Sequence, residues 1–466
     1  MMKSKAIVFA HLIFSIGSSW HAYDSRLADI TNENCSTYHR DQTPHIIAPN
    51  QSIRLWPGLI REHDVSHGNS LYGFRTAVDM IWRHQHPSNC KTAKFLISNG
   101  WFGGFASVPH VEGVALAVAL ELGRILLPHP DGVIRGPPRN FGTKVDQGWQ
   151  VDTRFCQEQG KRSLECYYEP WSSCTMEDAL RGKHLNTYPE LWLTENDVYA
   201  IQRSGNKSLP SSFKKRYSDF RTIIFTNIAC PFHFIPTALR DIVDCSPMKK
   251  EFQYYWWRAV SATYMIRPNR RTLLELERYR TLRLNFSNEG CVAVHVRLGD
   301  KGAEMKLVPL KVYLSAAQRV WESGRMTRAP QQRTPVLIIS SDDPDVYTNA
   351  SRWGRRRGWR VLYTTLVDKS KLSSRLDYLR LAAARRSGVG LEHHELEYFS
   401  MLLNLDYALR CHAWVCPLQS NTCRLIDEMR ATVGGKAASG VLVDVSTETC
   451  LNPPCIDGVG MMNVGW

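Results

Sequence analysis

The chain has 466 residues, of which 43% are hydrophobic and 22% are charged. This composition is that of an ordinary globular protein and excludes a disordered or fibrous chain. The length exceeds what a single hydrophobic core normally serves, so we expect two domains. The formal net charge of +14 suits an anionic partner, which can be a nucleic acid, a membrane surface or a small molecule.

Residues 1–22 predict a signal peptide or a short membrane anchor. A basic start precedes an apolar run from Ala6 to Ile16, and small residues follow it, in the order of a secretory signal. The run is too short for a comfortable membrane span, which needs about 18 or more apolar residues. No later stretch of the sequence approaches that length. We therefore expect the body of the protein to lie outside the membrane.

Cysteines and glycosylation motifs agree with a secretory compartment. The chain has 13 cysteines, and disulfides persist where the environment is oxidising. The segment "CLNPPC" predicts a short disulfide loop between Cys450 and Cys455, and no pair of CxxC motifs predicts zinc. Asn-x-Ser/Thr sequons, which predict a glycoprotein, occur at Asn34, Asn50, Asn206, Asn285 and Asn349.

The first half, residues 23–285, predicts an α/β domain that begins after a loosely ordered lead-in. Pro109 suits the first turn of a helix, and Gly123 suits its C-terminal cap. The glycine-rich turn "NGWFGGFASVPH" separates the first strand from this helix. The predicted elements are a helix near residues 74–82, a strand at 93–98, a helix at 111–123 and a strand at 124–128.

The middle of this half, residues 130–220, predicts an insertion fastened by disulfides. It carries the aromatic segment "CYYEPWSSC" and three cysteines, which are Cys156, Cys166 and Cys174. A strand at 221–228 follows, and then two helices that link the halves, at residues 249–266 and 270–282.

The second half, residues 286–446, predicts a regular alternation of strands and helices, with a tail at 447–466. Strands are expected at 291–296, 336–340, 359–364, 413–416 and 440–445, with helices at 309–323, 344–357, 395–410 and 420–432. Alternating strands and helices predict a parallel, doubly wound sheet. We therefore expect an α/β protein with two doubly wound, Rossmann-like domains and a cleft between them.

The densest basic run is "RWGRRRGWR", from Arg352 to Arg360. It would suit nucleic acid, but the secretory start argues against that partner. We favour a structural explanation. The arginines occupy the last turn of a helix that begins near Pro344 and stops at Gly358, where cations complement the helix dipole.

Polar residues follow three strands of the second half, at the edge where a doubly wound sheet holds its ligand. The segment "HVRLGDKGAEM" places five ionisable groups directly after an apolar strand, and such groups are costly to bury unless they meet a ligand or each other. Together the three segments suggest a nucleotide pocket, with arginine and backbone amides for phosphate. The polar residues are His295, Arg297, Asp300, Lys301, Glu304, Asp342, Asp343, Gln419, Ser420 and Asn421.

Each segment also has a structural explanation. Asp343 and Asn421, taken singly, suit helix capping. Asp343 and Asp345 could hold a metal, but their place at a helix start favours capping or ligand recognition. The glycine-rich turn lacks the lysine of a P-loop and the spacing of GxGxxG, so alone it is a weak signal for phosphate.

In combination these segments resemble the fucosyltransferases that use GDP-fucose, most closely the α1,6-fucosyltransferase family that acts on N-glycan cores. The resemblance runs in order from about residue 93 to residue 432. The residues that carry it are Gly100, Gly103 and Gly104; His295, Val296, Arg297, Asp300, Lys301, Glu304, Pro309 and Tyr313; Asp342, Asp343 and Pro344; and Val415, Cys416, Ser420, Cys423 and Arg424.

The resemblance implies a GT-B-like fold, GDP-fucose as the donor, no cofactor or metal, and inversion at the fucose anomeric carbon. It implies that Arg297 holds the diphosphate and that Glu304 takes the proton of the acceptor hydroxyl. Lys301 would keep Glu304 ionised or pass on its proton, and Asp300 is the next candidate for the base. Donor contacts are expected from His295, Asp342, Asp343, Ser420, Asn421, Gly103, Gly104 and a group near Asn404.

Three positions depart from the family pattern. Leu298 stands where a second arginine is usual, one residue is missing between Lys301 and Glu304, and Asn404 replaces an aspartate, with Asp406 as a substitute. Cys416 and Cys423 match cysteines of the family, so we expect a disulfide that closes the loop between them.

We therefore expect a Golgi or secretory-lumen enzyme that transfers fucose from GDP-fucose to a glycan or glycoprotein, with no nucleic-acid partner. Two alternatives stay open. One is a protein O-fucosyltransferase, which uses the same donor and a folded acceptor. The other is a secreted nucleotide-sugar or glycan-binding protein that has lost catalysis.

Overall fold

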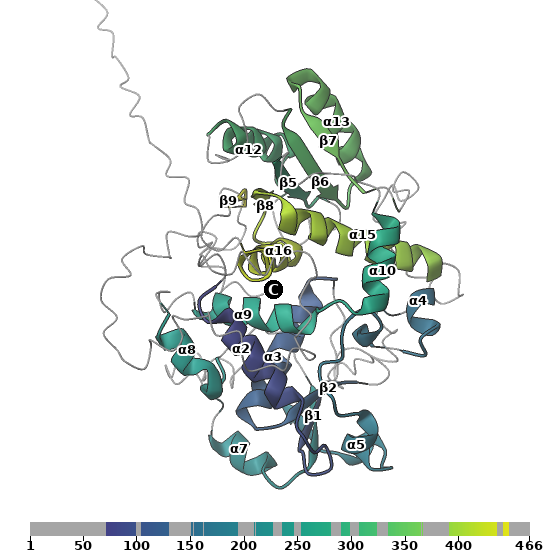
Figure 1. Cartoon of the computed structure of the whole chain (residues 1–466), viewed down its shortest axis with the longest axis vertical. Helices are drawn as coiled ribbons and strands as arrows, with labels where there is room; N and C mark the ends of the chain where they lie inside the picture. Colours follow the sequence, from purple (N-terminus) through teal and green to yellow (C-terminus); the bar gives the residue numbers. More distant parts are fainter. Residues whose placement is uncertain are drawn as a thin grey trace, which may run out of the picture.

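The computed structural model describes much of the chain between residues 71 and 446 (Figure 1). The signal peptide or anchor, the C-terminal tail with Cys450 and Cys455, and the predicted boundary near residue 285 lie outside the described residues, as do the sequons other than Asn349. The described residues are 71–98, 104–129, 151, 153–161, 163–193, 209, 211–226, 235–246, 253–280, 290–298, 307–323, 334–364, 366, 391–435 and 441–446.

The first half is built on a parallel sheet in the strand order β2-β1-β4-β3. Every residue of β1 and β4 is buried, as expected for a parallel sheet with both faces covered. The sequence predicts β1, β2 and β4 but misses β3, because three residues are too few to show a periodicity. The strands are β1 (Phe95–Ser98), β2 (Ile125–Pro128), β3 (Glu190–Trp192) and β4 (Thr222–Thr226).

Helix α3 (Ser107–Glu121) lies at the centre of the first half, and its residues from Ser107 to Ala119 are all buried. Pro109 lies in its first turn, as predicted. Gly123 follows the C-terminal cap with φ of 62°, a left-handed conformation that favours glycine. The other helices of this half are α2 (Phe74–Gln85), α4 (Arg154–Gln157), α5 (Met176–Leu180), α7 (Ser211–Tyr217), α8 (Arg240–Asp244), α9 (Gln253–Met265) and α10 (Arg270–Tyr279).

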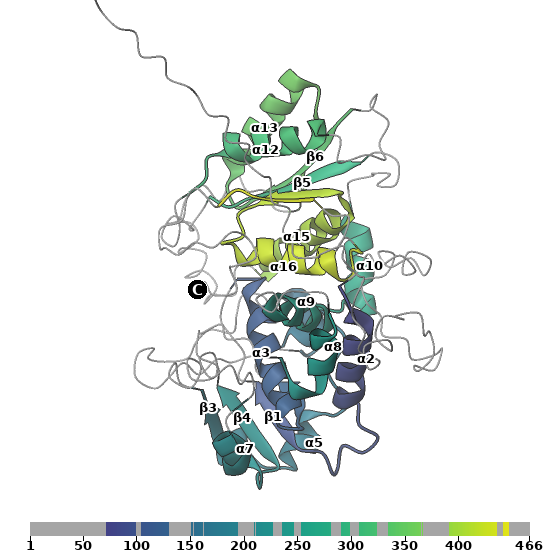
Figure 2. The ribbon, with the colours of Figure 1, turned by 90° about the vertical axis from the view of Figure 1, so that its left-hand side faces the viewer.

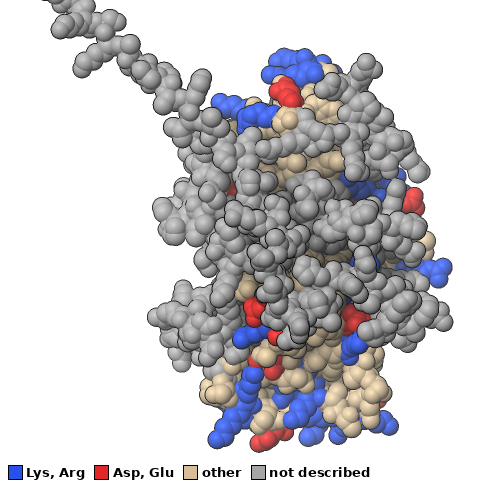
Figure 3. Space-filling view, turned by 60° about the vertical axis from the view of Figure 1, so that its left-hand side comes forward, with Lys and Arg blue, Asp and Glu red and all other residues tan. Residues whose placement is uncertain are grey.

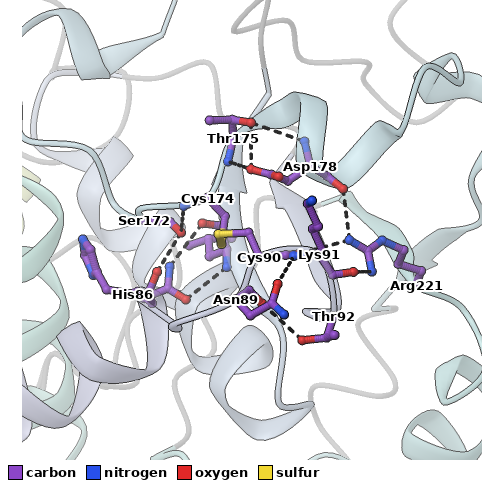
Figure 4. Close-up of a disulfide and its surroundings, with 12 residues drawn as sticks. His86, Asn89, Cys90, Lys91, Thr92, Ser172, Cys174, Thr175, Asp178 and Arg221 are labelled. Carbon is purple, nitrogen blue, oxygen red and sulfur yellow. Dashed lines mark hydrogen bonds between the residues drawn. A yellow bond between two sulfur atoms is a disulfide. The ribbon is translucent and has the colours of Figure 1, made fainter.

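The three cysteines between residues 130 and 220 all form disulfides. The bridges are Cys90–Cys174 and Cys156–Cys166. Figure 4 shows the first of them beside α5, where the Arg221 guanidinium donates to the backbone carbonyls of Lys91 and Asp178. The loop after α2 and the start of α5 are therefore held together by one covalent bond and by one shared cation.

The second half is built on a parallel sheet in the order β7-β6-β5-β8-β9. A disulfide joins Cys291, the first residue of β5, to Cys411, just before β8, with Cα atoms 4.9 Å apart. At the same edge the buried Arg430 donates to the carbonyls of Ala408, Cys411 and His412. The strands are β5 (Cys291–Val296), β6 (Val336–Ser341), β7 (Arg360–Leu362), β8 (Ala413–Cys416) and β9 (Val441–Asp444).

Helices cover both faces of the second sheet. Helices α12 (Leu310–Glu322) and α13 (Pro344–Arg357) pack with it into one apolar cluster. Helices α15 (Leu391–Arg410) and α16 (Asn421–Ala431) belong to a different cluster on the opposite face. This arrangement confirms the predicted doubly wound α/β architecture of the second half, and the first half adds its own parallel sheet.

The arginine run lies at the end of α13, as predicted. Asp343 caps the start of this helix, and Gly358 ends it with φ of 74°. Arg355, Arg356 and Arg357 are exposed in its last turn, where they complement the helix dipole. Figure 3 shows lysine and arginine side chains at the top and bottom of the described surface and also along its right-hand side.

Helices α3, α9, α15 and α16 form a middle layer between the two sheets (Figure 2). Helix α16 contacts α9, α3 and α15, although it follows α3 by about 300 residues in the sequence. One apolar cluster runs through this layer and includes side chains of both halves, among them Leu116, Trp256, Tyr398 and Leu425. The inner faces of the two sheets therefore share one core, whereas their outer faces pack into separate apolar clusters.

Candidate functional site

The order of strands in the second sheet defines where a ligand would bind. From β5 the chain proceeds outward through β6 to β7, and it then returns to place β8 on the other side of β5. The direction of winding therefore reverses between β5 and β8. In open α/β sheets ligands bind at such a switch point, outside the carboxyl ends of the strands.

Two predicted site residues lie at the carboxyl end of β5. The Nδ1 atom of His295 lies 3.0 Å from the Oγ atom of Ser340 on the neighbouring strand. The imidazole also stacks near the Trp414 indole of β8, with ring centroids 6.4 Å apart. His295 thus spans the three central strands, although its side chain is only partly buried.

Arg297 and Asp342 form an ion pair across the ends of β5 and β6. The other carboxylate oxygen of Asp342 accepts the backbone N–H of Leu298 at 3.0 Å. Each side chain of the pair is 25% exposed. Asp342 therefore orients Arg297 at the edge of the sheet, and any anion that approaches the guanidinium meets this carboxylate as well.

Asp343 caps a helix, which is one of the two roles that its place in the sequence suggests. Its carboxylate accepts the backbone N–H of Asp345 at 2.9 Å and caps α13. This use accounts for the residue without a ligand.

The turn from β8 into α16 completes the site. Cys416 and Cys423 form the predicted disulfide, with Cα atoms 6.0 Å apart. Ser420 is the N-cap residue of α16, yet its side chain makes no capping hydrogen bond. The amides of the first turn consequently keep their capacity for an anion. The buried Oδ1 atom of Asn421 has no hydrogen-bond partner among the described residues.

Asp444, at the end of β9, fixes the same turn, and no local pattern in the sequence predicts this role. Its Oδ1 atom accepts the backbone N–H of Leu418 at 3.0 Å and that of Ser446 at 2.9 Å. This pattern holds the chain between β8 and α16 in place beside the switch point.

Asn404 and its proposed substitute Asp406 have separate surroundings on α15. The Asn404 Oδ1 atom accepts a hydrogen bond from Thr364, which follows β7, at 3.0 Å. The buried Asp406 pairs with Arg280, the C-cap residue of α10, and with Arg410 of its own helix. These bonds give Asp406 a structural task, which argues against it as the substitute donor contact.

The remaining predicted site residues lie mostly outside the described part of the chain. These are Glu304, Lys301, Asp300 and Gly103. Gly104 is described, and its carbonyl accepts the backbone N–H of Ser107 at 2.9 Å at the start of α3. The roles expected for all five stay predictions.

Among the described residues, no group of three or more His, Cys, Asp or Glu side chains is arranged to hold a metal ion. In the same part of the chain, no helix has the length and apolar character that crossing a bilayer requires.

The middle layer contains a buried ionic cluster that the sequence analysis does not predict. The Glu428 carboxylate of α16 meets the His110 imidazole of α3, with Nε2 and Oε2 2.7 Å apart. Its other oxygen accepts from the Arg258 guanidinium of α9. The signals in the sequence are a histidine in the apolar start of α3 and a lone arginine in the aromatic segment "QYYWWRAV".

The charges in this cluster determine the protonation of its members. Burial alone would raise the pKa of Glu428, but the positive charge of Arg258 and the hydrogen bond with His110 together lower it. Burial lowers the pKa of His110. We therefore assign an ionised Glu428 between a charged Arg258 and a neutral His110.

Comparisons with known proteins give structural likeness alone. No protein-family model matches the sequence, and no curated protein matches it. The solved structure of fucosyltransferase NodZ from Bradyrhizobium is 13% identical, with a TM-score of 0.36, and the match covers 72% of this chain and 92% of that one.

Two further solved structures are similar at the same level. A mutant of Arabidopsis thaliana FUT1 in complex with GDP is 11% identical, with a TM-score of 0.39 and coverage of 77% of this chain and 73% of that one. POFUT1 in complex with GDP-fucose is 10% identical, with a TM-score of 0.38 and coverage of 76% and 99%. At such identities and TM-scores the likeness does not assign the chain to a family.

Proposed function

We propose that this chain is an inverting glycosyltransferase that transfers fucose from GDP-fucose to a glycan, with the core of an N-glycan as the preferred acceptor. The observation that carries the proposal is the switch point between β5 and β8. His295 and Arg297 lie at the carboxyl end of β5, and α16, whose N-cap side chain makes no capping hydrogen bond, follows the neighbouring strand β8. The order of the "HVRLGD", "SDDP" and "SNTCR" segments in the sequence supports the same reading.

The diphosphate of the donor is assigned to the cationic side of this site. Arg297 and the first-turn amides of α16 supply charge-assisted and helix-terminal hydrogen bonds to an anion. Asp342 sets the direction of the guanidinium. His295 and Asn404 are assigned to the guanosine side, and Gly103 and Gly104 to the donor loop of the first half.

The reaction then requires one proton transfer and one displacement. The acceptor hydroxyl oxygen attacks the anomeric carbon of fucose, and the bond from that carbon to the diphosphate oxygen breaks. GDP leaves with the electron pair, and Glu304 takes the hydroxyl proton, with Lys301 and Asp300 beside it in sequence. Arg297 stabilises the charge that develops on the leaving diphosphate, which is an electrostatic contribution to catalysis.

A donor screen tests the proposal directly. Binding of GDP-, UDP- and CMP-sugars to the whole protein is measured by thermal shift and then by calorimetry. We expect stabilisation by the GDP compounds alone. Equal responses to all three nucleotides, or none to GDP, would remove the basis of the proposal.

Transfer is then measured with free N-glycans and with folded protein domains as acceptors. Transfer to glycans supports the proposed acceptor, whereas transfer to folded domains alone identifies a protein O-fucosyltransferase. Binding of GDP-fucose without either transfer or donor hydrolysis identifies the non-catalytic binding protein.

Arg297→Ala tests the diphosphate contact. The change should weaken GDP binding by about 1.5–3 kcal/mol, the range for hydrogen bonds to charged groups. Arg357→Ala is the matched control, because this arginine is exposed at the far end of α13. Equal GDP affinities in the two variants would contradict the assignment of Arg297.

A further inference from the structure

We propose that Glu428 is a positioning residue, which fixes the helix that begins at the donor site against the helix that follows the glycine-rich turn. The proposal rests on the proposed function for the identity of the ligand. Its structural part rests on the ionic cluster alone.

The cluster joins three helices at one carboxylate. Each oxygen of Glu428 has its own partner, His110 on α3 and Arg258 on α9. The three side chains are 3%, 0% and 5% exposed for His110, Glu428 and Arg258. No solvent is therefore available to replace either partner, and the carboxylate must sit where both can reach it.

The cluster connects α3, which follows the glycine-rich turn, with α16, which begins at the switch point. His110 lies in the first turns of α3, shortly after Gly104. Glu428 lies two turns into α16, which starts beside β8 at the switch point. Arg424, one turn nearer to that start, adds positive charge that lowers the pKa of both Glu428 and His110. The cluster thus lies two turns along α16 from the end that faces the switch point.

A gain in the free energy of unfolding does not explain why such a cluster is present. A buried ion pair can often be replaced by apolar side chains of similar volume at no cost, because removing charges from water offsets their attraction. What the apolar replacement loses is direction, since two hydrogen bonds define a register that apolar contacts do not. We therefore assign the register of α16 against α3 to this cluster.

The decisive variant replaces the whole cluster with apolar side chains of similar size. It is His110→Phe, Arg258→Met and Glu428→Met together in the full chain. Urea unfolding should show stability close to that of the wild type. GDP affinity, measured by calorimetry, should fall about 10-fold, within the usual range for coupling between parts of a protein. Amide hydrogen exchange in the second turn of α16 should become faster.

The matched control removes a different polar link between α9 and α16. The Thr263 and Thr432 hydroxyls lie 2.7 Å apart in the core, at the C-cap of α16 and at the opposite end of this helix from the switch point. The Thr432 hydroxyl also donates to the backbone carbonyl of Glu428 at 3.0 Å, but it does not contact the Glu428 carboxylate. Thr263→Val with Thr432→Val should leave GDP affinity and exchange near the start of α16 unchanged. An equal loss in this control would show that any polar link in the layer has the same effect, and the proposal would be wrong.

The outcomes separate this proposal from the proposed function. A wild-type protein that does not bind GDP contradicts the function, while the exchange measurement still decides the role of Glu428. A stable apolar variant with wild-type GDP affinity and exchange overturns the positioning role. If the triple variant does not fold, His110→Phe alone preserves the Arg258–Glu428 pair and should lower GDP affinity about 5-fold. Unchanged affinity in that variant overturns the proposal equally.

Discussion

Two buried carboxyl groups of the middle layer, Glu112 on α3 and Glu428 on α16, differ in almost every respect except their burial. Glu112 is 3% exposed and Glu428 is 0% exposed. Burial raises the pKa of Glu112 to about 7, and a hydrogen bond with Ser98 opposes this only in part. The pKa of Glu428 is lowered, because Arg258 and His110 outweigh the same burial.

The comparison shows that the charged and hydrogen-bonding partners of a buried carboxyl group, and not its degree of burial, determine whether it is ionised. The Oε2 atom of Glu112 has no hydrogen-bond partner among the described residues, so its proton is easily retained. Glu428 keeps its charge and uses it to join helices of both halves. Glu112 therefore lowers the stability of the fold near neutral pH, whereas Glu428 connects helices of the two halves.

The largest effect is expected when the cation beside Glu428 is removed. Arg258→Met leaves a buried carboxylate with its charge uncompensated, so the free energy of unfolding should fall by about 3–5 kcal/mol. Urea unfolding at pH 8 measures it. Adding Glu428→Met should restore most of the loss, and a double variant as unstable as the single one would contradict this account of the pair.

The next effect has the opposite sign and depends on pH. The folded pKa of Glu112 is raised above its ordinary value of 4.5 to about 7. Its contribution to stability is therefore fully present below pH 4.5, decreases as the pH rises, and is gone above about pH 7. Glu112→Gln does not titrate, so it should be more stable than the wild type by about 3 kcal/mol at pH 8.

Unfolding midpoints of this variant and the wild type at pH 5 and pH 8 provide the measurement. The advantage of the glutamine should shrink strongly at pH 5, where the wild-type carboxyl is mostly protonated. A gain of the same size at both pH values would mean that packing, and not ionisation, is responsible.

Asp427 offers an intermediate case beside Glu428. Burial raises its pKa to about 6, and the hydrogen bond from Tyr255 at 2.9 Å opposes that rise. Tyr255→Phe should reduce stability at pH 8 by about 1.5–3 kcal/mol, the usual value for a hydrogen bond to a charged group. At pH 5 the loss should be smaller, because the acid is then protonated. An equal loss at both pH values would place the effect in packing.

The smallest effect is expected for an exposed pair. Arg154 and Glu158 lie 3.0 Å apart with side chains 73% and 46% exposed. Arg154→Gln should change stability by less than about 0.5 kcal/mol, because water screens such pairs. A loss of stability as large as that expected for Tyr255→Phe would show that burial does not cause the difference between the Arg154–Glu158 pair and the Tyr255–Asp427 pair.

The second half could be predicted well from its sequence, because its strands and helices are regular and carry local signals. Asp343 and Gly358 define both ends of α13, and the Cys416–Cys423 bridge closes a short loop. The place of the charged residues after apolar strands predicts that they lie at the ends of β5 and β6. It does not predict the pairing of Arg297 with Asp342, since this pairing depends on the register between two strands.

The ionic cluster could not be predicted in the same way. In the sequence, "CRLIDEMRAT" reads as an ordinary helix with a charged, solvated face. That face is buried only because α3 and α9 pack on it, and the histidine that meets Glu428 lies 318 residues away. Long-range packing of this kind leaves no local pattern in either segment.

The shared middle layer also limits how the chain could be divided into fragments and how one half could be exchanged for another. A fragment that ended between the two sheets would expose apolar residues of α3 and α9, or of α15 and α16, that are otherwise buried in one cluster. It would also separate Glu428 from both His110 and Arg258. Neither half can then be transplanted as a ready-made module. A recombination event that replaced one half would have to bring a matching surface for the other in the same step.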